Sequence, residues 1–101
     1  MRLFLDDRRP SPAPDFVLCT TAEEAKDALS ADEYDLVSLD YDLGPFADTG
    51  LDVLKWMDEN GVRPARINIH STHFFGKGEM EDYARAHFPH TLVTALDARG
   101  L

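Results

Sequence analysis

Three short polar clusters follow apolar runs of the sequence, and their residue types could bind a metal ion and a phosphoryl group. The clusters are Asp6 with Asp7, Asp40 with Asp42, and His70 with Ser71. Two carboxylates about 4 Å apart repel by roughly 4 kcal/mol at an effective dielectric near 20, so an acidic cluster favours a bound cation or a raised pKa on one member. Mg²⁺ takes carboxylate ligands and is the expected cofactor. The predicted metal site consists of Asp6, Asp7, Asp40 and Asp42.

Short strands must position these clusters. Apolar runs predict five strands, at residues 3–5, 16–19, 36–39, 67–69 and 92–96. Several runs are continuous rather than alternating, which is typical of strands buried on both faces. If the strands are parallel neighbours, their carboxyl ends meet at one edge of the sheet, where open α/β folds bind ligands. The three clusters are then expected side by side.

Helical patterns separate the later strands. Thr21 begins a capping-box sequence, Thr49 is expected to cap a second helix, and a third helix covers roughly residues 79–88. The order β-β-α-β-α-β-α-β predicts an α/β fold with a doubly wound, mainly parallel five-stranded sheet in a single domain over residues 1–101. The first and last helices of such a fold are missing. A proline-rich connector replaces the first, and five residues follow the last strand.

The two missing helices would cover the same face of the sheet. A parallel sheet with one bare face is unfavourable, because its apolar side chains would contact water. We therefore expect the proline-rich loop and a second copy of the chain to cover this face. This predicts a homodimer.

The amino-acid composition restricts the classes of partner that the protein is expected to bind. The chain has 10 basic and 19 acidic residues and a net charge of −9, which argues against extended duplex binding but allows contact with one phosphate or a strand end. Cys19 is the single cysteine and is expected in the core. No apolar run approaches transmembrane length, and the charged Arg2 and Asp6 leave no room for a secretory segment. A cytoplasmic protein without a membrane partner is expected.

Basic and hydroxyl side chains near the clusters could hold an anion. Arg8 follows the acidic pair, and a guanidinium matches phosphate bidentately. Lys77 lies between two glycines and is expected just before a helix amino terminus, which favours anions. His70 could donate a proton to a leaving alkoxide, or be a core histidine bonded to backbone. Ser71 could bond a phosphate oxygen or cap the loop.

The same loop contains two adjacent aromatic side chains. Phe74 and Phe75 could stack on a base, although packing in the core is the simpler expectation. His73 precedes them and could assist the chemistry.

Four blocks of sequence together resemble a response-regulator receiver domain. They are Leu5 to Arg8, Ser38 to Gly44, Thr49 with Gly50, and Ile69 to Ser71. More specifically, they resemble a divergent group of bacteria and phages, the cyclic-phosphate-processing receiver-like domain, over about residues 2–81. The resemblance implies a flavodoxin-like fold, magnesium on the acidic pair, and processing of cyclic phosphates or phosphorylated nucleic-acid ends. It also implies that Asp40 occupies the phosphoryl-acceptor position of ordinary receivers and that Ser71 contacts the phosphate. Thr49 joins Arg8 and Lys77 as an expected substrate-binding residue.

The chain departs from both patterns. Tyr41 stands where the divergent group usually has histidine, and His73 and Phe74 replace an expected Asn-Pro. No lysine follows the last strand, whereas ordinary receivers have one there that contacts the phosphoryl group.

The residues leave two classes of function open. One is magnesium-dependent binding or processing of a phosphoryl group on a small molecule or nucleic-acid end, with Asp40, His70 and Ser71 as the catalytic set. A metal-dependent cyclic phosphodiesterase would be its enzymatic form. The other is a signalling or interaction module without turnover. A haloacid-dehalogenase-type phosphatase is a weaker third reading, since the residues after Asp82 include one acid, Asp97, and no lysine.

Overall fold

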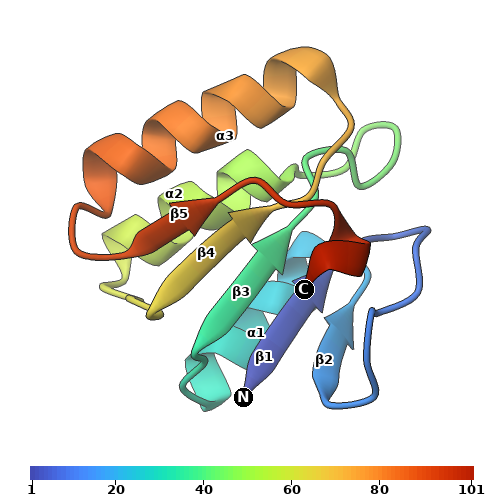
Figure 1. Cartoon of the computed structure of the whole chain (residues 1–101), viewed down its shortest axis with the longest axis horizontal. Coiled ribbons are helices and arrows are strands. Elements are labelled where there is room, and N and C mark those ends of the chain that lie inside the picture. Colours follow the sequence, from blue (N-terminus) through green and yellow to red (C-terminus); the bar gives the residue numbers. More distant parts are fainter.

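The computed structural model describes residues 1–101 and arranges the apolar runs as one five-stranded parallel sheet (Figure 1). The strands are β1 (Arg2–Leu5), β2 (Phe16–Cys19), β3 (Leu36–Leu39), β4 (Arg66–Ile69) and β5 (Leu92–Thr94). All four pairings are parallel and the strand order is β2-β1-β3-β4-β5. The predicted doubly wound sheet is therefore confirmed. β5 ends at Thr94, earlier than predicted, because the Leu96 backbone bonds the side chain of Asn68.

The helices are α1 (Ala22–Ala31), α2 (Gly50–Glu59) and α3 (Phe74–His87). The Thr21 hydroxyl accepts from the Glu24 amide, and Thr49 forms a full capping box with Asp52. The predicted start of α3 near residue 79 is wrong. The helix begins at Phe74, because His73 caps it by accepting the Gly76 N–H at Nδ1 (2.9 Å). None of the helices combines the length and the apolar character needed to cross a membrane.

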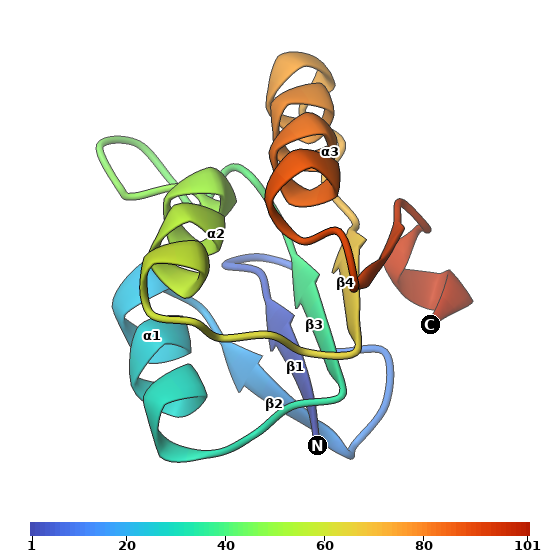
Figure 2. The ribbon, with the colours of Figure 1, turned by 90° about the vertical axis from the view of Figure 1, so that its left-hand side faces the viewer.

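All three helices pack on one face of the sheet (Figure 2). They enclose a core of 18 buried residues that includes the inward residues of the strands. The opposite face has only a small apolar cluster of Phe4, Phe16, Leu36 and Ala98. The three helices therefore leave this face of the sheet without a helix, as the sequence predicted.

This chain partly covers the helix-free face itself. Ala13 of the proline-rich loop packs on the small cluster, as expected. The C-terminal segment, which contains the 3₁₀ turn Ala98–Gly100, contributes Ala98 to the cluster and packs Leu101 against it. Leu18 and Leu92, in the edge strands, remain 47% and 61% exposed. The homodimer through this face stays a prediction.

Asn68 attaches the C-terminal segment to the helix-free face. Its Nδ2 donates to the Leu96 carbonyl (3.0 Å), and its Oδ1 accepts from the Leu96 amide (2.9 Å) and from the Thr94 hydroxyl (2.7 Å). Asn68 is fully buried. A buried amide with these partners leaves several groups unpaired when it is removed.

We expect Asn68→Ala to lower the free energy of unfolding by about 2 kcal/mol or more, since each buried unpaired group costs about 1–3 kcal/mol. Urea unfolding measures this loss, and amide exchange near Leu96 should accelerate. Thr91→Ala is the matched control, because the half-buried Thr91 hydroxyl makes one bond, to the Pro64 carbonyl (3.2 Å), beside the other end of β5. Equal losses in the two variants would contradict the attachment.

Candidate metal and phosphoryl site

A polar hollow of about 170 Å³ lies at the carboxyl edge of the sheet. No hydrophobic side chain lines it. Its lining consists of residues that follow β1, β3 and β4: Asp6, Asp7, Arg8, Arg9, Asp40, Asp42, Ser71, Thr72 and His73. The sheet ladder continues into these segments, because the Asp40 N–H donates to the Leu5 carbonyl (3.0 Å) and the His70 N–H to the Leu39 carbonyl (3.1 Å). The parallel register therefore aligns the three polar clusters.

The segment Asp40–Tyr41 is held by the first turns of two helices. Gly50, the first residue of α2, packs so closely that a Cβ there would collide with the Asp40 carbonyl oxygen, and its N–H donates to the Tyr41 carbonyl (3.0 Å). Gly76 of α3 packs on the Tyr41 ring in the same way. Only glycine permits such close approaches. They fix the backbone that carries the Asp40 carboxylate.

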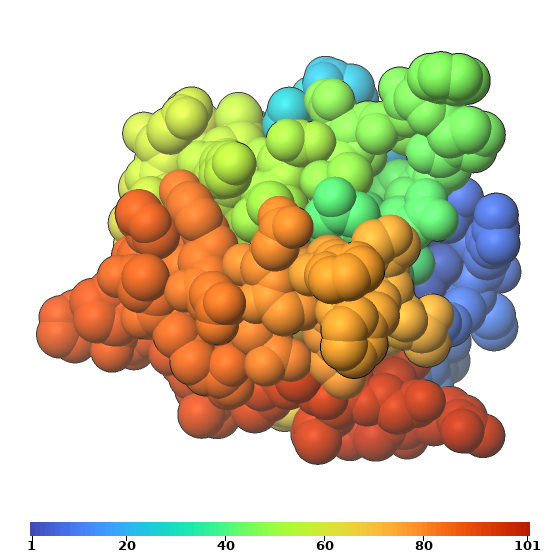
Figure 3. Space-filling view, turned by 90° about the horizontal axis from the view of Figure 1, so that it is seen from above, coloured from blue at the N-terminus to red at the C-terminus, as the bar shows by residue number.

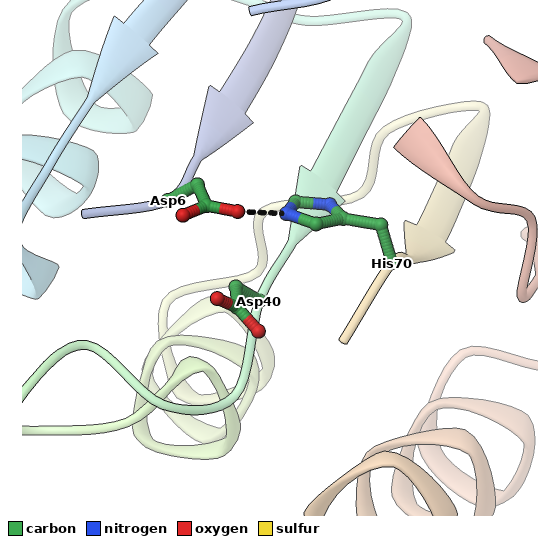
Figure 4. A group of neighbouring side chains, drawn as sticks. All are labelled: Asp6, Asp40 and His70. Atoms are coloured by element: carbon green, nitrogen blue, oxygen red, sulfur yellow. Dashed lines mark hydrogen bonds and ion pairs between the residues drawn. The ribbon is translucent and has the colours of Figure 1, made fainter. Parts of the chain in front are cut away.

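Asp6 is the most enclosed acid of the site, at 1% exposure. Its Oδ1 accepts from the backbone N–H groups of Arg8 (2.9 Å) and Arg9 (3.0 Å). Its Oδ2 bonds His70 Nε2 at 3.1 Å (Figure 4). The same oxygen lies 3.6 Å from Arg9 Nη1. Protein donors therefore surround this carboxylate.

His70 belongs to a chain of buried side chains that crosses the helix-free face. Its Nδ1 bonds Ser38 Oγ (2.7 Å), Ser38 Oγ accepts from Asn68 Nδ2 (3.3 Å), and the imidazole stacks on Phe4 with ring centres 4.3 Å apart. A carboxylate accepts and does not donate, so we assign the neutral tautomer with the proton on Nε2, facing Asp6. The Ser38 hydroxyl then donates to Nδ1. Burial lowers the pKa of His70 and keeps the ring neutral, although Asp40 and Asp6 act in the opposite direction.

Asp40 is less well satisfied than Asp6. Its Oδ1 accepts the Tyr41 N–H at 2.8 Å, and it lies beside the Asp6–His70 pair (Figure 4). Burial and, secondarily, the negative charge of Asp6 raise the pKa of Asp40, while the Ser71 hydroxyl, His70 and the Tyr41 amide act against them. The ionised form of Asp40 is therefore disfavoured by its surroundings.

The charges of the hollow suit a divalent cation. Its four carboxylates and two guanidinium groups leave two negative charges, with His73, the one histidine of its lining, counted as neutral. Carboxylate oxygens of Asp6 and Asp40 lie within 4.8 Å of each other, and Asp7 and Asp42 line the same hollow. Carboxylates at this spacing are the donors that magnesium uses in proteins, so the residues present fit the expected ion.

The structure places some of the predicted site residues in the hollow and others outside it. Arg8 and Ser71 line the hollow together with the four acids. Thr49 does not; its hydroxyl is used within the capping box of α2. Lys77 was predicted to lie just before a helix amino terminus, and this is wrong. It lies within α3 and lines a neighbouring groove. His70 is not placed as a proton donor to a ligand, because its side chain is fully enclosed and both ring nitrogens have protein partners.

Sequence reasoning missed three residues of this site. Arg9 lines the hollow and donates to the His70 carbonyl (3.0 Å) and to the Thr72 hydroxyl (3.3 Å). Ser38 and Asn68 form the buried chain behind His70. Their signal is visible in the sequence, since each is a polar residue that interrupts an apolar strand two positions before Asp40 or His70.

A family model described as the cyclic-phosphate processing receiver domain matches residues 1–86. The chain belongs to this family. Among solved structures, it is similar to the receiver domain of Francisella response regulator 1452, with a TM-score of 0.65 and 17% identity over 91% of this chain and 81% of that one. That likeness confirms the flavodoxin-like, receiver-type fold. A search of functionally curated proteins gives no match.

The raised pKa of Asp40 predicts a pH-dependent effect of its removal. The folded protein binds the Asp40 proton more tightly than the unfolded chain does, so ionisation of Asp40 at neutral pH lowers the free energy of unfolding. We expect Asp40→Asn to be more stable than the original protein at neutral pH without divalent ions. The gain should disappear as the pH falls below about 4, where the carboxyl is protonated in both states. Urea unfolding across this range measures it, with Asp27→Asn, at an exposed acid of α1, as the control for removing one charge. A gain that is independent of pH would contradict the assignment.

The assigned tautomer of His70 predicts its nitrogen NMR spectrum. At neutral pH we expect the shifts of a neutral ring with a protonated Nε2 and an unprotonated Nδ1, and a slowly exchanging Nε2 proton. Ser38→Ala removes the donor to Nδ1 and should shift the Nδ1 resonance. The exposed His90, for which the structure shows no hydrogen bond, is the internal reference. A protonated Nδ1 in the unaltered protein would overturn the assignment.

Proposed function

We propose that the protein binds a cyclic phosphate ester in the acidic hollow with Mg²⁺ and opens the ring by hydrolysis. The observation that carries the proposal is the pairing of the two buried acids, Asp6 and Asp40, with Arg8 and Arg9 in one hollow. Membership of the cyclic-phosphate processing receiver family supports the class of ligand.

The basic side chains would hold the phosphate. Arg8 is exposed at the rim and has no side-chain partner in the protein, so its guanidinium is available to a ligand. Arg9 is oriented by the His70 carbonyl and the Thr72 hydroxyl. A guanidinium binds phosphate oxygens bidentately. The Ser71 oxygen accepts the His73 N–H (3.0 Å), so the hydroxyl hydrogen remains free for Asp40 or a phosphate oxygen.

Carboxylates of Asp6 and Asp40 would hold the metal, with Asp7 and Asp42 close by. Bound magnesium would stabilise the negative charge that develops on the phosphoryl oxygens. Asp40 uses Oδ1 to accept the Tyr41 N–H, and its other carboxylate oxygen can accept a proton from the attacking water. Hydrolysis then forms one phosphorus–oxygen bond, breaks one ester bond of the ring, and requires a proton at the departing oxygen.

The proton that Asp40 takes from the attacking water can return to the departing oxygen, and His73 is better placed than His70 to hydrogen-bond that oxygen. It lines the hollow, and its Nδ1 accepts the Gly76 N–H, which puts the ring proton on Nε2. Nε2 has no hydrogen-bond partner within the protein. The imidazole is oriented by the Tyr41 ring, whose centre lies 4.7 Å away.

Hydrolysis of a nucleoside 2′,3′-cyclic phosphate, followed by phosphorus NMR with Mg²⁺ present, tests the proposal. We expect Asp40→Asn to lower kcat by about 100-fold or more, the range for loss of a general base, and to weaken Mg²⁺ binding measured by calorimetry. His73→Gln should lower kcat and leave Mg²⁺ binding unchanged. Asp27→Asn is the control and should behave like the unaltered protein.

Two results would contradict this function. Turnover that survives Asp40→Asn would exclude the acidic hollow as the reaction site. A phosphoryl adduct on Asp40 after incubation with acetyl phosphate and Mg²⁺, without ring opening of any cyclic ester, would instead establish a phosphoacceptor module of the receiver type.

A further inference from the structure

Half of the phenylalanines of this protein are exposed, and all three exposed ones follow β3 or β4. Phe4, Phe16 and Phe88 are buried, whereas Phe46, Phe74 and Phe75 are 109%, 86% and 74% exposed. The expectation that Phe74 and Phe75 pack in the core is wrong. Their rings contact each other edge to face, with centres 5.3 Å apart, in the first turn of α3. Two adjacent exposed aromatic rings form an apolar surface that a soluble domain rarely presents without a use.

This aromatic pair adjoins the acidic hollow. Phe74 directly follows His73, which lines the hollow. Phe74, Phe75 and Lys77 line an open groove that has Thr72 in common with the hollow. Figure 3 shows the first turn of α3, in light orange, projecting between the green loop after β3 and the red C-terminal segment. A ligand held in the hollow can therefore extend past Thr72 onto the two rings.

The pair is also held in a fixed position relative to Asp40. Tyr41, the residue after Asp40, packs against both His73 and Gly76, which bracket Phe74 and Phe75 in the sequence. Arg9 reaches Thr72 at the border of the two recesses (3.3 Å). The surface that presents the rings is thus attached directly to the proposed reaction centre.

We infer that Phe74 and Phe75 form a stacking surface for an unpaired nucleobase, so that the phosphate ester of the acidic hollow is that of a nucleoside. This inference rests on the proposed function for the phosphate end of the ligand. Every base has a π face, and exposed aromatic side chains bind unpaired bases by stacking without selecting their sequence. Stacking also suits a protein of net charge −9, which cannot rely on general attraction of the nucleic-acid backbone.

The charges along the groove restrict the length of the ligand. Lys77 is the single basic residue of the groove, and Glu79, Glu81 and Asp82 line its remainder. Further phosphates beyond the stacked base would meet these carboxylates. The groove therefore fits one terminal nucleotide, either free or at the end of a single strand.

Calorimetric binding in the presence of Mg²⁺ tests the inference. If Asp40→Asn still binds Mg²⁺, this variant is used so that the ligand is not turned over. If it does not, the KM of the unaltered protein is measured from initial rates. Adenosine 2′,3′-cyclic phosphate is compared with glycerol 1,2-cyclic phosphate, which lacks a base. We expect the nucleoside ester to bind about tenfold more tightly or better, the size of one stacking contact. The double variant F74S/F75S should lose this preference and keep its affinity for the glycerol ester.

Phe46→Ser is the matched control, because Phe46 is even more exposed but lies outside the groove, and it should keep the preference. A preference that survives F74S/F75S, or that is absent from the unaltered protein, would overturn the inference. Comparing the affinity for a single strand that ends in a 2′,3′-cyclic phosphate with the affinity for the free cyclic nucleotide shows which of the two is the preferred ligand.

Adenosine without phosphate separates the two proposals. In the unaltered protein it should shift the ring resonances of Phe74 and Phe75, whereas ribose should not. These shifts would support the stacking surface even if neither cyclic ester bound and the proposed function failed. Absent shifts would overturn it.

Discussion

The site depends on the burial of two like charges, Asp6 and Asp40, at one edge of the sheet. Their surroundings are unequal. Asp6 accepts two backbone N–H groups and the His70 proton and faces Arg9, whereas Asp40 accepts one backbone N–H and has a raised pKa. A low-dielectric position magnifies such a difference. The protein thus stabilises one acid internally and leaves the other to be stabilised by a ligand or a proton.

Close packing around Asp40 explains why the site can hold this unfavourable arrangement. The starts of α2 and α3 both press glycines onto Asp40 and Tyr41, so the backbone cannot turn to move the carboxylate into water. Two glycines in helical positions lower helix propensity by about 1 kcal/mol each relative to alanine. Stability is given up at the same positions that hold the reactive group in place.

Much of the fold could be predicted from the sequence, because short continuous apolar runs and their alternation with helical patterns determine a parallel sheet and its edge. The absence of a helix between β1 and β2 followed from the short length of chain that joins them. The start of α3 could not be predicted, since Gly76 and Gly78 disfavour a helix locally and the compensating contact, Gly76 on Tyr41, is tertiary. The same error misplaced Lys77 and the two exposed phenylalanines. Likewise, nothing local to His70 and His73 distinguishes the enclosed ring from the one that lines the hollow.

The buried hydrogen-bonded side chains behind His70 have a consequence for the metal ions that the hollow could bind. The Leu96 amide and carbonyl orient the Asn68 side chain, which orients the Ser38 hydroxyl and thereby the imidazole. The ring consequently directs a proton, not a lone pair, toward Asp6. Asp6, Asp7, Asp40 and Asp42 offer hard oxygen donors, and a zinc ion among them would lack the imidazole of His70 as the nitrogen ligand that zinc favours in proteins. Any preference of the hollow for hard over borderline ions would thus originate in a backbone contact beside the far edge strand of the sheet.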